Sequence, residues 1–196
     1  MRNETRIYQP ERKLWGVSLI SAPLIFAAST FFWEKGEYGV NGGTILAIAT
    51  VFWITAFMGL FSLLKDKMPR YAVWGLLIAI AGCISGANFG FVGVYSAVFN
   101  ISHQTYLEEF AKYPVSANTL LFWSGPLFPL SLLVLGIMLI RTKAVPVWTG
   151  IVISLAGILF PVSRIPRIEW IAHIADALLL IPLCFLGFRF LITKSN

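Results

Sequence analysis

The chain has 196 residues, of which 58% are hydrophobic and 12% charged, and its mean hydropathy is +0.79. Soluble domains contain about 45–50% apolar and about 25% charged residues, so this composition excludes an ordinary water-soluble domain. The net charge of +6 would suit either a nucleic-acid partner or a membrane, and the positions of the charges decide between them.

Charged clusters divide the chain into six apolar segments, each able to cross a hydrocarbon layer of about 30 Å as a helix of about 20 residues. Most segments are apolar around the whole helix, and the alternation typical of membrane β-barrels does not occur in the sequence. We therefore predict an all-α, polytopic integral membrane protein with one six-helix domain over residues 1–196. The predicted spans are Leu14–Trp33, Thr44–Leu64, Tyr71–Asn100, Thr119–Ile140, Val145–Val162 and Ile168–Ile192.

Basic residues fall mainly on one side of these six spans. Lysine and arginine next to a span tend to stay cytoplasmic, so we predict a cell-membrane protein with both termini in the cytoplasm. The lipid bilayer then explains the basic excess, and no nucleic-acid partner is needed. The cytoplasmic set is Arg2, Arg6, Arg12, Lys13, Lys65, Lys67, Arg70, Arg141, Lys143, Arg189 and Lys194, and the outer set is Lys35, Lys112, Arg164 and Arg167.

The first apolar segment ends in bulky residues. Phe31, Phe32 and Trp33 stand where a signal peptide would carry small cleavage-site residues, so we interpret the segment as a retained span. Residues 34–43 follow as a predicted polar hairpin loop, with an Asn-Gly-Gly turn at 41–43.

The third span carries four glycines at helical spacing, and small residues about four apart allow helix backbones to approach closely in lipid. We favour a central helix packed within the chain, and keep a homo-oligomer or a membrane partner bound through this face as the alternative. At about 45 Å the helix exceeds a perpendicular span, so it must tilt, kink or project on the outer side. The glycines are Gly82, Gly86, Gly90 and Gly93.

The outer connection over residues 101–118 predicts a short interfacial helix on the membrane surface. Thr105 and Glu108 have capping-box spacing. The apolar residues after Thr105 recur on one face until Pro114 stops the pattern.

The outer half of the fourth span is predicted to be kinked or partly unwound. Ser124, Gly125 and Pro126 are consecutive, Pro129 follows, and proline frees backbone carbonyls inside a helix. Irregular backbone at membrane depth is tolerated where it lines a cavity or is buried in protein.

The sixth span carries the ionisable groups that lie deepest in the membrane. Glu169, His173 and Asp176 share one helical face, and intramembrane ionisable groups are functional-site hypotheses by default. We expect Asp176 to pair with His173, or with Asn88 or Tyr95 of the third span, and Glu169 to be solvated near the interface.

These residues predict a small-ligand site in the outer half of the bundle. Its expected residues are His173, Asp176, Asn88, Tyr95 and Ser124. The alternative is that His173 and Asp176 only satisfy each other in a helix contact. A proton shared by this pair would act as a switch at pH 5–7.

The two histidines of the chain, His103 and His173, are both predicted on the outer side. With Glu169 and Asp176 they suggest a metal site, or together they suggest the two axial ligands of a haem. Against either cofactor, a solvated histidine in a loop is common.

Three functions remain open on the sequence. The first in rank is binding or transport of a small ligand through an outward-facing cavity lined by His173 and Asp176. The second is an accessory subunit that binds a membrane partner through the glycines of the third span. The third is an outer-face membrane enzyme or cofactor protein that uses His103 and His173.

Overall fold

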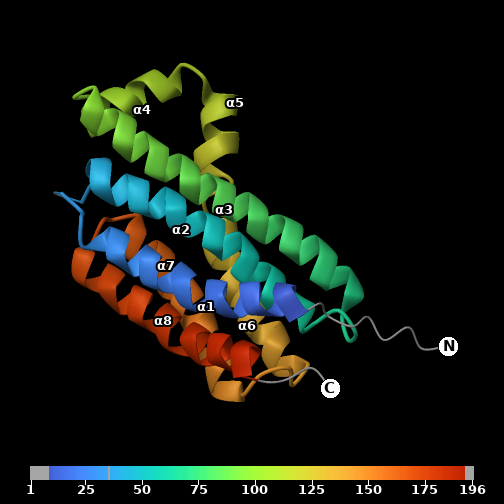
Figure 1. The fold of residues 1–196 in the computed structure, drawn as a ribbon. Coiled ribbons are helices and arrows are strands. Elements are labelled where there is room, and N and C mark those ends of the chain that lie inside the picture. The colour runs from blue at the N-terminus through green and yellow to red at the C-terminus, as the bar shows by residue number, and fades with distance from the viewer. Residues whose placement is uncertain (1–8, 35, 193–196) are drawn as a thin grey trace.

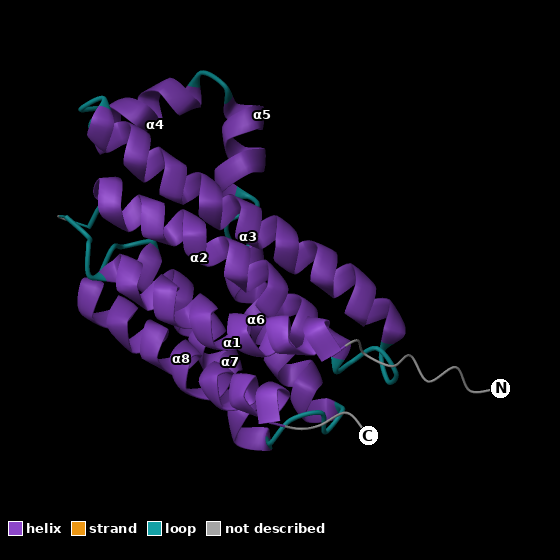
Figure 2. Ribbon diagram, viewed as in Figure 1, coloured by secondary structure: helices purple, strands orange, loops and turns teal. Residues whose placement is uncertain are grey.

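The computed structural model describes residues 9–34 and 36–192, and this part of the chain consists of helices and loops (Figures 1 and 2). Of the basic residues that predicted the topology, Arg2, Arg6, Lys35 and Lys194 lie outside the described residues. The elements are α1 (Gln9–Thr30), α2 (Gly39–Ser62), α3 (Pro69–Val98), α4 (His103–Ala111), α5 (Pro114–Ala117), the π-turn η1 (Asn118–Phe122), α6 (Leu127–Arg141), α7 (Val147–Arg164) and α8 (Glu169–Ile192).

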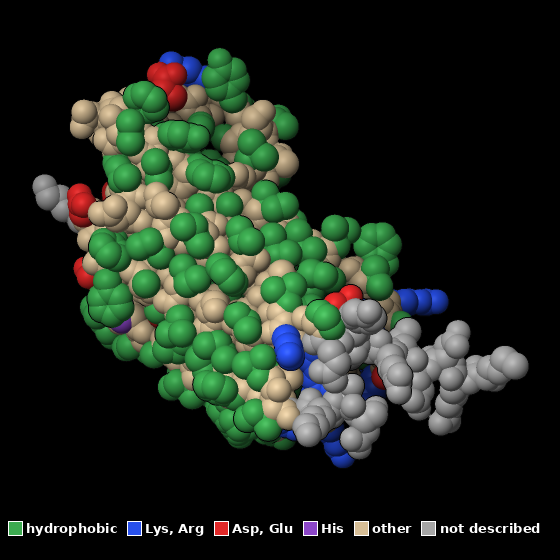
Figure 3. Space-filling view, viewed as in Figure 1, with side chains coloured by type: hydrophobic (Ala, Val, Ile, Leu, Met, Phe, Trp, Pro, Cys, Tyr) green, Lys and Arg blue, Asp and Glu red, His purple; other side chains and the backbone are tan. Residues whose placement is uncertain are grey.

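The predicted set of six apolar spans is confirmed. Helices α1, α2, α3, α7 and α8 are each long and apolar enough to cross a membrane, and so is the continuous stretch Pro114–Arg141 that contains α5, η1 and α6. Apolar side chains also cover much of the molecular surface in Figure 3. Six such helices with an apolar exterior indicate a membrane-embedded protein.

The six long helices form a closed ring in the order α1, α2, α3, α6, α7, α8, with α8 packed against α1. Aromatic side chains fill its interior. Trp53 of α2 is fully buried, with the Phe128 ring at 5.0 Å and the Phe57 ring at 5.6 Å. The ring order places α3 and α8 on opposite sides of the bundle, which bears directly on the site.

The connection between α1 and α2 is shorter than predicted. Helix α2 begins at Gly39, so the expected hairpin turn over residues 41–43 is helical instead. Close packing explains these glycines, because a side chain on Gly43 would overlap the carbonyl oxygen of Gly90. The chain reverses at 34–37, where Glu34 and Glu37 exchange backbone hydrogen bonds.

The glycine face of α3 packs against α2 and α6 of the same chain. A Cβ atom added to Gly90 would lie 2.6 Å from the Gly43 oxygen, and one added to Gly82 would lie 2.7 Å from the Cα of Phe128. Gly93 faces Tyr38, and Gly86 has more room, with its nearest neighbour at 3.3 Å. A membrane partner would therefore have to use another surface of α3.

Helix α4 begins earlier than its predicted cap. The Ser102 side chain accepts a hydrogen bond from the backbone N–H of Thr105 at 3.1 Å, so Ser102, and not Thr105, is the N-cap. Glu108 is bonded to Gln104 instead of to the cap backbone. The reason for the shift is that Ser102 is itself a strong capping residue three positions before Thr105.

The fourth span is broken where its sequence predicted unwinding. The π-turn η1 precedes a non-helical stretch over 123–126, after which α6 begins at Leu127. Two polar side chains of α3 bond to the interrupted backbone: Ser85 donates to the Leu121 carbonyl at 3.2 Å, and Asn88 donates to the Leu120 carbonyl at 3.1 Å.

Candidate functional site

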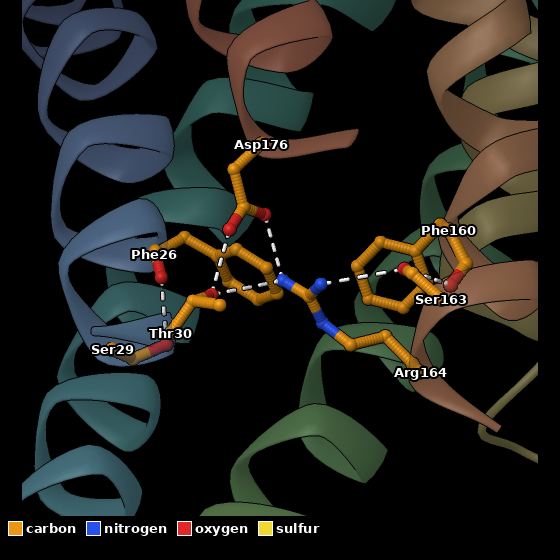
Figure 4. A network of polar contacts seen from close by, with 7 residues as sticks. All are labelled: Phe26, Ser29, Thr30, Phe160, Ser163, Arg164 and Asp176. Atoms are coloured by element: carbon orange, nitrogen blue, oxygen red, sulfur yellow. Dashed lines mark hydrogen bonds and ion pairs between the residues drawn. The ribbon is translucent and has the colours of Figure 1, made fainter. Parts of the chain in front are cut away.

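Asp176 lies at the junction of α1, α7 and α8 and has two partners that the sequence did not suggest (Figure 4). Its Oδ1 atom accepts a hydrogen bond from Arg164 Nη2 at 2.7 Å, and its Oδ2 atom accepts one from Thr30 Oγ1 at 2.6 Å. The same Nη2 donates to Thr30 Oγ1 at 3.2 Å. Each helix therefore contributes one polar group to a buried centre, which we call the Arg164–Asp176–Thr30 cluster.

The ion pair of this cluster is almost completely removed from the surface. The exposed fractions of the side chains are 8% for Arg164 and 2% for Asp176. Taking two charges out of water costs several kcal/mol per ion, which the mutual attraction offsets only if the geometry is good. A buried ion pair of this kind is therefore weak evidence for a stabilising role.

An aromatic cage surrounds the Arg164 guanidinium. Its central carbon lies 5.1 Å from the ring centroids of Trp33 and Phe160 and 5.2 Å from that of Phe26. Such contacts stabilise a desolvated cation by about 2 kcal/mol. Nη1 lies 3.4 Å from Ser163 Oγ, whereas Nε is buried without a hydrogen-bond partner among the described residues.

A second arginine lies next to this cage. The guanidinium carbon of Arg167 is 5.9 Å from the Trp33 ring and 5.2 Å from the Tyr38 ring. Arg167 donates to the Gly36 carbonyl at 2.7 Å and lies 3.7 Å from Glu37 Oε2. Two arginines thus contact one buried tryptophan, whose own indole N–H has no hydrogen-bond partner in the described part of the chain.

The corner between α7 and α8 brings the two arginines together. Helix α7 ends at Arg164, and the backbone of Arg167 adopts a positive φ of 57° before α8 begins at Glu169. The Ile168 N–H donates back to the Ser163 carbonyl at 3.0 Å and closes the corner. The tight turn holds Arg164 inside the bundle while Arg167 faces the α1–α2 connection.

Asp176 bonds to Arg164 and Thr30 and not to the expected partners, although the His173 side chain lies near enough to act on it electrostatically. His173 packs at a tilt of 39° on Phe31 with ring centroids 4.5 Å apart, and its Nε2 atom lies 3.8 Å from Glu169 Oε1. Asn88 bonds to the broken fourth span, and Tyr95 is exposed and stacks on Phe91. For Asn88 and Tyr95 the physical reason is that α3 faces α8 across the ring. His173 shares α8 with Asp176, but its ring packs on Phe31.

Ser124 and His103 also have contacts that do not involve Asp176. Ser124 Oγ is buried in the broken span without a described hydrogen-bond partner. His103 Nδ1 lies 3.0 Å from Glu37 Oε1, and its ring packs on Tyr106. Within residues 9–34 and 36–192, no three His, Cys, Asp or Glu side chains are grouped closely enough to hold a metal ion.

Sequence reasoning missed Arg164 because it treated this residue as an outer-loop charge in the topology count. A usable signal was present: an aspartate inside an apolar bundle needs a cation, and the predicted outer side offers few. No feature of the sequence singled out Thr30 as a partner of Asp176, since hydroxyl residues are common in apolar spans.

Comparison with protein-family profiles, with curated proteins and with solved structures finds no match to this chain.

Tyr106 provides a reporter for the docking of α4. Burial and the Glu37 carboxylate raise its pKa, and Arg167 partly opposes them. Because the folded-state pKa exceeds the unfolded value of about 10, this tyrosine stabilises the fold below pH 10 and loses that contribution as pH rises further.

We expect Glu37→Gln to lower the Tyr106 pKa in a titration of phenolate absorbance. The Tyr106→Phe variant identifies which part of the absorbance belongs to Tyr106. An unchanged pKa would contradict the packing of α4 against Glu37, and Glu34→Gln is the matched control.

Proposed function

We propose that this protein binds and transports a small anionic ligand at the Arg164–Asp176–Thr30 cluster. The observation that carries the proposal is the buried Arg164 guanidinium, whose Nε atom has no hydrogen-bond partner in the described part of the chain and whose charged partner there is the Asp176 carboxylate. Arginine is suited to this role because its planar fork of donors matches a carboxylate and stays charged at any physiological pH.

Asp176 supplies the exchange step. A ligand carboxylate can bind Arg164 only after Asp176 has dissociated from it. Protonation of Asp176 favours this dissociation because it removes the negative charge that competes with the ligand. The ligand and a proton therefore enter together, so the buried charge of the cluster does not change. Thr30 bonds to both Arg164 and Asp176 and can keep one of these bonds during the exchange. In this proposal, the pairing of Asp176 with Arg164 belongs to a closed state that excludes the ligand.

The orientation in the cell membrane belongs to the same proposal. The starts of α1 and α3 and the ends of α6 and α8 carry basic residues, which supports a cytoplasmic location for that end of the bundle. The described cations at the other end are Lys112, Arg164 and Arg167, of which the two arginines are turned into the protein. This supports an outward-facing site, with α4 lying along the outer membrane surface.

Thermal unfolding of the purified full chain in detergent micelles tests the binding step. We expect succinate, acetate or benzoate at 100 times its Kd to stabilise the folded protein by about 2.7 kcal/mol. For a chain of this size the Tm rises by about 5–10 °C, compared with chloride at equal ionic strength. The effect should weaken as pH rises from 5 to 8. Arg164→Lys should abolish it, and no carboxylate-specific shift at any of these pH values would refute the proposal.

Asp176→Asn should bind the same anions more tightly than the wild type, by about tenfold or more at pH 8. The substitution leaves the Arg164 charge without its internal anion, so an added carboxylate no longer competes with Asp176. Binding should also lose its pH dependence, because the proton acceptor is gone. Glu169→Gln, on an exposed position of the same helix, is the control. Retention of the wild-type affinity and pH profile by Asp176→Asn would contradict exchange at Arg164.

A further inference from the structure

A cavity of about 300 Å³ lies between α4 and the broken start of the fourth span, in a different part of the molecule from the Arg164–Asp176–Thr30 cluster. Leu107, Phe110 and Ala111 of α4 line one wall. Ala117, Asn118 and Phe122 line the other. Ligand pockets in proteins begin at about this volume.

The walls of this cavity are mostly apolar, with Asn118 as the polar residue among those that line it, although one wall is irregular backbone. The carbonyl of Asn118 accepts from the Trp123 N–H at 2.7 Å. The carbonyls of Leu120 and Leu121 accept from side chains of α3, as described above. These three carbonyls thus bond at the end of η1 or toward α3, which leaves mainly apolar side chains, with Asn118 among them, to face α4. An occupant with polar groups along its length would find few partners there.

The cavity adjoins the surface that faces lipid. Val115, Leu120 and Phe122 belong to the same segment and expose their side chains, and the Pro114–Arg141 stretch is itself long and apolar enough to span a membrane. Figure 3 shows acidic and basic side chains at one edge of the otherwise mostly apolar surface, and Lys112 and Glu109 form an exposed ion pair at the end of α4. A mostly apolar cavity that shares Phe122 with the exposed apolar surface and lies near charged groups suits a phospholipid, with its chain inside and its headgroup at the edge.

We propose that this cavity binds one acyl chain of a membrane phospholipid, which enters from the surrounding bilayer. The bound chain fills the space between α4 and the broken span and holds α4 against the bundle. The proposal is independent of anion binding at Arg164.

Native mass spectrometry of the full-length protein tests the proposal with dioleoylphosphatidylglycerol as the probe. After detergent purification and addition of a few equivalents of this lipid, we expect a form that retains one lipid per chain. Ala111→Phe adds a ring to the wall of the cavity and should reduce the retained fraction at least fivefold. Val115→Phe adds the same ring at an exposed position outside the cavity lining and should retain the lipid.

Two further measurements on the wild-type protein distinguish binding of the acyl chain from binding of the headgroup. Neither depends on the folding of a variant. The single-chain lysolipid should compete for the site, whereas glycerophosphoglycerol, which has no chain, should not. A wild-type protein cross-linked to a phospholipid with a diazirine in its chain should carry the label on α4 and α5 residues of the cavity. Three results would each overturn the proposal. They are equal lipid retention by Ala111→Phe and Val115→Phe, displacement of the lipid by the headgroup alone, and labels confined to the lipid-facing surfaces of α3 and α8.

Discussion

Arg164→Ala is expected to lower the free energy of unfolding by about 3–5 kcal/mol, because Asp176 would remain buried as an unpaired charge. The substitution also empties the space among Phe26, Trp33 and Phe160, which adds a cavity to the lost ion pair. Arg167→Ala is the matched control: Arg167 is more exposed and lies 3.7 Å from its carboxylate, so loss of this pair, of the Gly36 hydrogen bond and of the ring contacts should cost less, about 2 kcal/mol or below.

The double variant Arg164→Met/Asp176→Leu separates stability from function at this site. Replacement of both charges with apolar side chains of similar size is often neutral or stabilising, so this variant should recover most of the loss seen in Arg164→Ala. It should still fail to bind carboxylates. Thermal or denaturant unfolding in micelles measures the first effect, and the Tm shift with succinate measures the second. A double variant as unstable as Arg164→Ala would show that the charge pair itself stabilises the bundle, which would remove the argument for a ligand.

Gly90→Ala is expected to destabilise the protein by about 1–3 kcal/mol or more through overpacking. The added methyl group would lie 2.6 Å from the carbonyl oxygen of Gly43, which is backbone and cannot rotate away. Helices α2 and α3 would have to separate where these two glycines meet. Gly43→Ala should behave in the same way, because its Cβ atom would overlap the Gly90 carbonyl.

Gly86→Ala is the control for this pair on the same face of α3. Its added methyl group would meet the Thr50 methyl at 3.3 Å, and a small side-chain movement can accommodate it. Alanine also favours a helix interior over glycine by about 1 kcal/mol, so the net change should be near zero or stabilising. Equal Tm values for Gly86→Ala and Gly90→Ala would contradict the close approach of α2 and α3. An association state that changes only in Gly90→Ala would instead favour a contact between chains.

The sequence predicted the six helices because hydrophobic length is a local property. Each apolar segment has to satisfy its own backbone in lipid, so its extent can be read without knowledge of its neighbours. The break in the fourth span was predictable for the same reason, since proline acts on the helix that contains it. The reading of residues 41–43 failed because Asn-Gly-Gly is typical of a turn, while here Gly42 and Gly43 provide close packing of α2 against other helices.

The candidate site was predicted in part. Asp176 stood out in the sequence because a carboxylate inside an apolar segment needs an explanation wherever the helix lies. Its partners depend on which helices are neighbours in the ring, and that order follows from side-chain packing between distant segments. Arg164 and Thr30 are 12 and 146 positions away from Asp176, and no periodicity in the sequence connects the three.

The sequence by itself therefore determined a membrane protein with six helices, an asymmetric distribution of basic residues and one buried acidic group, because composition and proline placement act within single helices. Only the tertiary structure decided that α3 faces α8 across the ring, that Asp176 pairs with Arg164 instead of His173, and that the broken span covers an apolar cavity under α4. These features arise where helices far apart in the chain meet, and the complementary shapes of their side chains decide which ones do.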